Sequence, residues 1–121
     1  MLYIKVKMKK YFLDFKGWDE FLGNKIKKKV CHKTEVIRDN FDIISIYYWA
    51  CPVVSIYRNG NIVLNNNGYN TPTTKRRLNQ LTPYGFQVFQ KDFKWYASNI
   101  NGEVVEFKSG LKIDINGNFI I

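Results

Sequence analysis

The sequence predicts an α+β fold, mostly antiparallel β, in which a curved sheet or partly open small barrel carries one short central helix. Three observations support this prediction. Aromatic residues make up 17% of the chain, and Tyr, Phe and Trp favour strands. Asn-Gly pairs at 59–60, 101–102 and 116–117 mark hairpin turns. Only the segment 71–81 combines a clear helix start with a clear helix end.

The first half of the chain contains alternating and aromatic-rich segments. Residues 2–9 alternate apolar residues with Tyr or Lys, which predicts a strand with a basic face. Residues 11–22 place apolar side chains three and four apart, which indicates a short helix. The basic run 25–38 is expected to be one extended strand, and 41–49 is the strongest strand candidate. Pro52 should then break or bulge the chain.

The second half predicts hairpins around a helix. Asn59-Gly60 indicates a type I′ turn. Thr71 and Thr73 are good helix N-caps, and Pro72 suits the first turn, so a helix is expected from about Thr73 to Leu81. Further strands are expected at 86–89, 93–97, 103–107, 111–115 and 118–121. With no repeat or linker in the pattern, residues 1–121 are predicted to form a single domain.

The composition indicates a cytoplasmic protein without a metal or cofactor. The longest apolar stretch without a charge, 43–57, is shorter than the ~18–20 residues that a membrane helix needs, and the first residues resemble no signal peptide. Cys31, His32 and Cys51 lack the paired spacing of a zinc site. We therefore expect two small, buried or half-buried thiols, no metal site and no membrane partner.

The net charge of +9 is distributed unevenly along the chain. Residues 1–38 carry +7, and this part includes the run Lys27, Lys28 and Lys29. Such a basic excess suits an anionic partner, which could be nucleic acid, an acidic protein surface or membrane headgroups. Solubility alone is the simpler explanation of the same charge, since lysines also protect the edges of sheets.

The segment 64–81, LNNNGYNTPTTKRRLNQL, carries the strongest chemical signal. A loop with a glycine leads into a helix start that is rich in hydroxyl and basic groups, and helix N-termini attract anions. The candidate nucleic-acid or anion-binding residues are Thr71, Thr73, Thr74, Lys75, Arg76, Arg77 and Asn79, together with Lys27, Lys28 and Lys29. Consecutive basic side chains cannot all point the same way, so Arg76 and Arg77 should differ in exposure, with one paired locally.

The same segment resembles a widespread family of small, uncharacterised proteins from tailed bacteriophages. The shared pattern is Gly-(Trp/Tyr)-x-Thr-x-Thr-Thr-Lys-x-Arg-(Ile/Leu)-Asn, which begins here at Gly68 and ends at Asn79. Downstream, Trp95-Tyr96 and the turn 107–110 also match. The likeness covers roughly 23–115, so residues 1–22 are expected to be a family-variable extension. The resemblance implies a phage or prophage origin, hence the cytoplasm of an infected bacterium, and it implies no activity.

Several functions remain open at this point. The charge and the aromatic residues favour a basic accessory protein that binds DNA or RNA, or phosphate groups, without catalysis. The alternative is an inhibitor of a host protein, such as a defence nuclease (an anti-CRISPR-like role) or a transcription component with an acidic or nucleic-acid-bound face. A virion component is a third. An enzyme is disfavoured, because the single histidine, His32, lies among lysines and no catalytic residue is expected.

Overall fold

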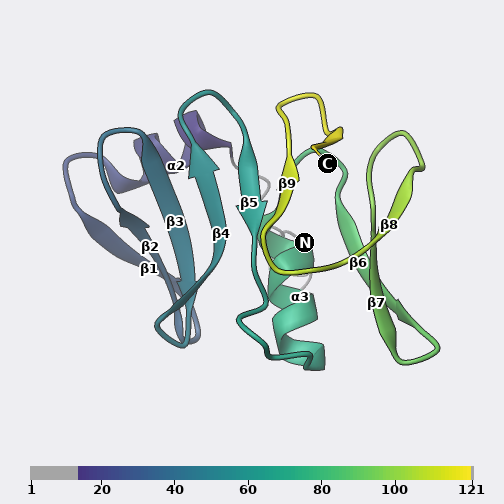
Figure 1. The fold of residues 1–121 in the computed structure, drawn as a ribbon. Helices are drawn as coiled ribbons and strands as arrows, with labels where there is room; N and C mark the ends of the chain where they lie inside the picture. The colour runs from purple at the N-terminus through teal and green to yellow at the C-terminus, as the bar shows by residue number, and fades with distance from the viewer. Residues whose placement is uncertain (1–13, 121) are drawn as a thin grey trace, which may run out of the picture.

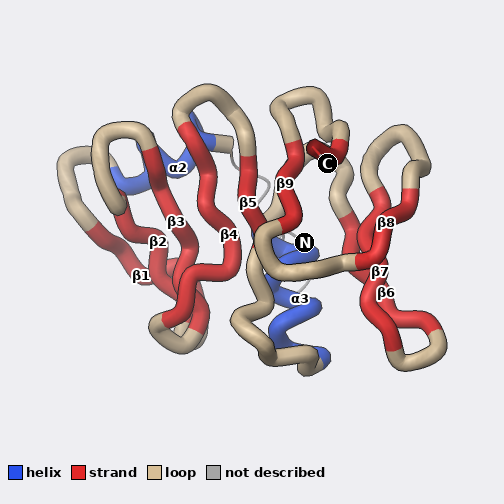
Figure 2. Tube along the Cα trace, viewed as in Figure 1, coloured by secondary structure: helices blue, strands red, loops and turns tan. Residues whose placement is uncertain are grey.

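The computed structural model describes residues 14–120, which form two helices and ten strands (Figures 1 and 2). The helices are α2 (Phe15–Leu22) and α3 (Pro72–Leu81). The strands are β1 (Lys27–Cys31), β2 (Thr34–Arg38), β3 (Ile43–Tyr48), β4 (Cys51–Tyr57), β5 (Ile62–Leu64), β6 (Gln87–Lys91), β7 (Lys94–Ser98), β8 (Val104–Glu106), β9 (Leu111–Ile113) and β10 (Phe119–Ile120). The strand expected at 2–9 and the start of the helix expected at 11–22 lie outside the described residues.

The strands form two antiparallel sheets. The larger sheet has seven strands in the order β1-β2-β3-β4-β5-β9-β10, and the smaller has the order β6-β7-β8. The larger sheet is curved and does not close, because β1 and β10 are its two ends (Figure 1). The predicted fold class is therefore confirmed, with α2 as a second helix besides the central α3.

The core lies between the two helices and one face of the larger sheet. Val36, Ile46, Val54 and Leu64 occupy matching positions on β2 to β5, and all four are fully buried. Alternate residues of a strand share a face, so this row forms an apolar surface for the helices. α2 contributes its buried Trp18, and α3 contributes the buried pair Leu78 and Leu81.

The helix α3 begins where the sequence predicts. The Thr71 side chain accepts a hydrogen bond from the Thr74 N–H at 3.2 Å, so Thr71 is the N-cap, and Pro72 follows at the first position. α3 also joins the two sheets. The amide of Asn79 donates to the Val88 carbonyl at 3.0 Å and accepts from the Val88 N–H at 2.7 Å. This pair of bonds holds β6 against the helix.

The expectation of one strand over 25–38 is wrong. The run folds into a hairpin of β1 and β2, and Lys33 adopts φ 52° in the turn. The Thr34 hydroxyl donates to the His32 carbonyl at 2.8 Å and closes this turn. The turn at 32–33 contains no Gly, Asn, Asp or Pro, which are the residues that usually mark a turn. Because the residues on both sides favour strands, the sequence pattern predicts one continuous strand. Pro52 behaves as expected, since the pairing of β3 with β4 shifts by a bulge beside it.

The type I′ turn expected at Asn59-Gly60 is also wrong. A type I′ turn needs a positive φ at both central residues, but of this pair only Gly60 has one, at 97°. The Gly60 N–H and the Asn61 carbonyl both bond to Tyr57, which defines a three-residue loop ended by a glycine bulge. The loops that end at Gly102 and Gly117 repeat the same pair of bonds.

Candidate functional site

Antiparallel pairing brings five connections to one end of the sheets, which we call the lower edge (Figure 1). They are the turns 32–33, 49–50 and 92–93, the loop 65–71 and the connection 107–110. The first turn of α3 lies there as well (Figure 1). The basic residues of this edge are Lys33, Lys75, Arg76, Arg77, Lys91, Lys94 and Lys108. Within residues 14–120, none of these side chains forms an ion pair.

Trp49 projects from the middle of the lower edge. Trp49 and Ala50 form the turn between β3 and β4, with φ values of 53° and 62°, and 59% of Trp49 is exposed. The Lys33 ammonium lies 4.8 Å from the centre of the Trp49 ring, and His32 meets that ring edge-on. An exposed indole with a cation over its face is therefore fixed at the tip of a hairpin.

One side of Trp49 faces a hollow of about 440 Å³, which we call the aromatic pocket. Its wall is made by the β3–β4 hairpin, the loop 65–71 and the first turn of α3. The lining residues are Tyr48, Trp49, Cys51, Val53, Asn66, Asn67, Tyr69, Thr71, Thr73 and Thr74. The pocket thus combines aromatic faces with hydroxyl and amide groups.

The loop that carries Tyr69 is held by its own polar groups. The Asn66 carboxamide accepts from the Gly68 N–H at 3.0 Å and from the Ser109 hydroxyl at 2.7 Å, and it donates to Asn70. The Asn67 amide donates to the Pro52 carbonyl at 2.9 Å. These bonds preorganise the loop, although 60% of Tyr69 is exposed.

The other side of Trp49 faces a second hollow, which we call the basic pocket. It has a volume of about 490 Å³. The lining residues are Lys29, His32, Lys33, Thr34, Glu35, Tyr47, Trp49 and Ala50. Burial, the hydrogen bond to Asp39 and the charge of Asp39 raise the pKa of Tyr47, so its phenol stays neutral in ordinary buffers. Two lysines, Lys29 and Lys33, against the single acid Glu35 give this hollow a cationic character.

The predicted threonines lie at the aromatic pocket. Thr71 and Thr73 are exposed, and their hydroxyl oxygens are 3.2 Å apart. Thr74 is buried and its N–H is bonded to Thr71. Since Pro72 has no N–H and the Lys75 N–H bonds to the Thr71 carbonyl, the helix start is largely capped by its own groups. Side chains therefore dominate the chemistry that this segment offers to a ligand.

The three consecutive basic residues point in different directions, as expected. Arg76 is exposed and Lys75 is half-buried. Arg77 donates to the Thr34 hydroxyl at 3.2 Å and to the Gln80 amide oxygen at 2.6 Å, and its guanidinium lies over the Tyr48 ring. The prediction that one arginine pairs locally is confirmed. The partners of Arg77 are a hydroxyl and an amide oxygen rather than a carboxylate.

The remaining predicted residues do not lie together with the residues at the start of α3. The Asn79 amide is occupied by Val88, which gives it a structural role. On β1, Lys28 lies over the Phe21 ring, with its ammonium 4.3 Å from the ring centre, while Lys29 lines the basic pocket. Lys27 is exposed on the same strand and lines neither of the two hollows.

Sequence reasoning missed the two aromatic side chains that frame the site. The sequence pattern predicts that Trp49 lies inside a strand, because Trp-Ala contains none of the usual turn residues. A signal existed for Tyr69, since a tyrosine directly after Gly68 in a polar loop has no apolar neighbour to pack against.

The described residues hold no group of three or more His, Cys, Asp or Glu side chains that could bind a metal. Both cysteines are free and half-buried, and two intervening strands separate them. Neither of the two described helices is long and apolar enough to span a bilayer.

The comparisons with known proteins assign a family. Neither a curated protein nor a solved structure matches the chain. A family model described as Kyanoviridae Gp96 protein matches residues 6–114, which is nearly the whole chain and includes both pockets. The match also extends further toward the N-terminus than the likeness at 23–115. The chain therefore belongs to the Kyanoviridae Gp96 protein family, a family of bacteriophage proteins.

Proposed function

We propose that this phage protein is a non-catalytic accessory protein that binds nucleic acid through the phosphates, using its lower edge. The observation that carries the proposal is the position of Trp49. It separates a pocket of aromatic, hydroxyl and amide groups from a pocket that contains Lys29, His32 and Lys33. Aromatic side chains beside basic grooves are the usual means of binding a nucleic-acid strand without sequence preference.

Three cations of the lower edge have no ion pair among the described residues and can contact phosphates. Lys33, Lys75 and Arg76 form no ion pair within the described residues, and Arg76 is exposed. A cation that is already paired gains little from a phosphate, whereas an unpaired one releases a counterion from the nucleic acid. The affinity should therefore fall steeply as the salt concentration rises.

The test is a salt titration of binding to labelled oligonucleotides with a matched pair of double variants. Lys75→Ala/Arg76→Ala removes two cations from the lower edge. Lys16→Ala/Lys25→Ala removes two exposed cations from the opposite end of the molecule. The first variant should reduce the slope of log K against log salt by about 1.4 on single strands and weaken binding about tenfold near physiological salt. The second should change the slope little.

Equal slopes in the two double variants would contradict the proposal, because binding would then follow net charge alone. Arg77 is excluded from the test variant, since its loss would break the bonds to Thr34 and Gln80. Circular dichroism and thermal unfolding should confirm that both variants remain folded.

One observation favours a second candidate, which is binding to a host protein. Phe93 is 95% exposed at the tip of the β6–β7 hairpin, between Lys91 and Lys94. Aromatic side chains that project among basic ones are frequent anchors of protein interfaces. Stoichiometric capture of one host protein by the wild type, and its loss in Phe93→Ala, would support this candidate.

A further inference from the structure

We propose that the aromatic pocket receives an unpaired nucleobase, so that the lower edge selects single strands over duplexes. The inference rests on the proposed function and adds to it the kind of nucleic acid. Its basis is the geometry of Trp49 and Tyr69, which line one hollow of about 440 Å³ and are 59% and 60% exposed.

The aromatic walls are positioned before any ligand arrives. Tyr69 lies on a loop fixed by Asn66, Gly68 and Ser109, and Trp49 lies in a tight turn under Lys33. A flat, apolar partner can enter between such walls at a small cost in conformational entropy. Every nucleobase offers a π-face for this contact.

The polar groups of the pocket favour binding of any base. The carboxamide of Asn66 is occupied on both atoms, and the Asn67 amide nitrogen bonds to Pro52. The Thr71 hydroxyl is engaged with Thr73 and Thr74. Few groups remain to read the edge of a base, so stacking should dominate and sequence preference should be weak.

The positive charges around the pocket define a path for the backbone of a nucleic-acid strand. The cationic hollow with Lys29 and Lys33 shares Trp49 with the aromatic pocket, and Lys75 follows directly after the pocket residues Thr73 and Thr74. A backbone that follows these cations passes Trp49 and can turn one base into the pocket. In a duplex the base is stacked and paired, and it cannot enter without first being extruded.

Trp49 provides a direct readout. The chain has three tryptophans, and Trp18 and Trp95 are 0% and 6% exposed. Quenching of tryptophan fluorescence by a bound base therefore reports on Trp49. The probes are an oligothymidylate, an abasic phosphodiester strand of equal length, and a blunt duplex of equal length.

The wild type should bind oligothymidylate about 5- to 150-fold more tightly than the abasic strand, with strong quenching by the former alone. Trp49→Ala and Tyr69→Ala should each lose most of this difference while they keep the salt slope of the wild type. Phe41→Ala is the matched control, because it removes a 75% exposed aromatic residue at the opposite end of the molecule that does not line the pocket.

The outcomes separate the two proposals. Equal affinity for oligothymidylate and the abasic strand, with a steep salt slope, would overturn the base pocket and leave the phosphate-binding surface standing. Tighter binding of the duplex than of oligothymidylate would likewise overturn the preference for single strands. No binding to any of the three probes would overturn both proposals.

Discussion

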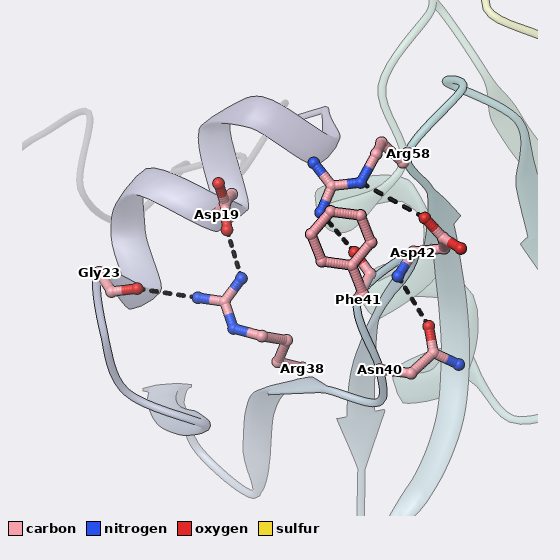
Figure 3. A network of polar contacts seen from close by, with 7 residues as sticks. All are labelled: Asp19, Gly23, Arg38, Asn40, Phe41, Asp42 and Arg58. Carbon is pink, nitrogen blue, oxygen red and sulfur yellow. Dashed lines mark hydrogen bonds and ion pairs between the residues drawn. The ribbon is translucent and has the colours of Figure 1, made fainter.

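The two ends of this molecule use their charges in opposite ways. The upper edge is formed by the loops 39–42, 58–61, 99–102 and 114–118, together with α2 (Figure 1). Both ion pairs of residues 14–120 lie there, Arg38 with Asp19 and Arg58 with Asp42 (Figure 3). Among residues 14–120, the cations of the lower edge have no such partners. Charge at the upper edge supports the fold, whereas charge at the lower edge would be available to the ligand that we propose.

The hairpin turns of the two edges also differ in the residues that adopt a positive φ. At the upper edge, three loops place a glycine at the position with positive φ, namely Gly60, Gly102 and Gly117. At the lower edge, three hairpin turns place residues other than glycine at positive φ, among them Lys33 at 52°, Trp49 at 53° and Phe93 at 66°. Backbone strain of this kind costs about 1–3 kcal/mol per residue and is concentrated at functional sites. The hairpin turns of the lower edge therefore carry more backbone strain than the glycine-containing turns of the upper edge.

The largest expected effect on stability concerns Gly60. A Cβ at this position would lie 2.7 Å from the Ile115 side chain, and φ is 97°. Gly60→Ala should lower the free energy of unfolding by about 2–4 kcal/mol, because steric overlap adds to backbone strain. Gly102→Ala is the matched control, since φ is 83° in the same kind of turn but no atom lies within 4 Å of its Cβ. Chemical denaturation should show a loss of only about 1 kcal/mol for the control.

The next largest effect is the difference in stability loss between two arginine substitutions, one at each edge. Arg38 donates to the Asp19 carboxylate and to the Gly23 carbonyl (Figure 3). Arg38→Ala should lower the free energy of unfolding by about 1–2 kcal/mol, because charged hydrogen bonds between α2 and β2 are lost. Arg76→Ala should change it by less than about 0.5 kcal/mol, as expected for an exposed residue without an ion pair or hydrogen bond among residues 14–120. Similar losses for both variants, measured by urea denaturation, would remove the contrast between the edges.

At the lower edge we expect a smaller change in the free energy of unfolding, and this change is an increase. Phe93 is 95% exposed at φ 66°, so its side chain contributes little packing while its backbone is strained. Phe93→Gly should raise the free energy of unfolding by about 0.5–1 kcal/mol, because relief of the strain exceeds the entropy that glycine adds to the unfolded chain. A thermal melt checks the sign, and a destabilised variant would contradict the idea of stored strain.

The contrast between edges also explains what the sequence could predict. The rows of apolar residues in β2 to β5 and the capped start of α3 follow local rules, so the fold class and the helix were predictable. The turns at 32–33 and 49–50 break those rules, because Lys33 and Trp49 take conformations that glycine or asparagine usually adopts. The two pockets depend on those turns. The threonines and Lys29 that line the pockets were therefore predictable from the sequence, whereas the positions of Trp49 and Lys33 were not.

The last and smallest expected effect is a pH dependence of the free energy of unfolding, which arises at the upper edge. Burial, followed by the negative charge of Asp14, raises the pKa of Tyr84, whose hydroxyl donates to the Gly60 carbonyl at 3.0 Å. The unfolded chain releases this proton near pH 10, before the folded chain does. The contribution of Tyr84 to stability is thus complete below about pH 10 and is lost as the pH rises through the folded pKa.

Tyr84→Phe should flatten the fall in stability above about pH 10, whatever its effect at neutral pH. Asp14→Asn is a finer control, because an asparagine oxygen can still accept the Gly17 N–H that caps α2. That variant should reduce the slope only in part, since burial is the larger cause of the raised pKa. Urea denaturation at a series of alkaline pH values measures both slopes. An unchanged slope in Tyr84→Phe would mean that the alkaline sensitivity arises elsewhere, with Tyr47 beside Asp39 as the next group to replace.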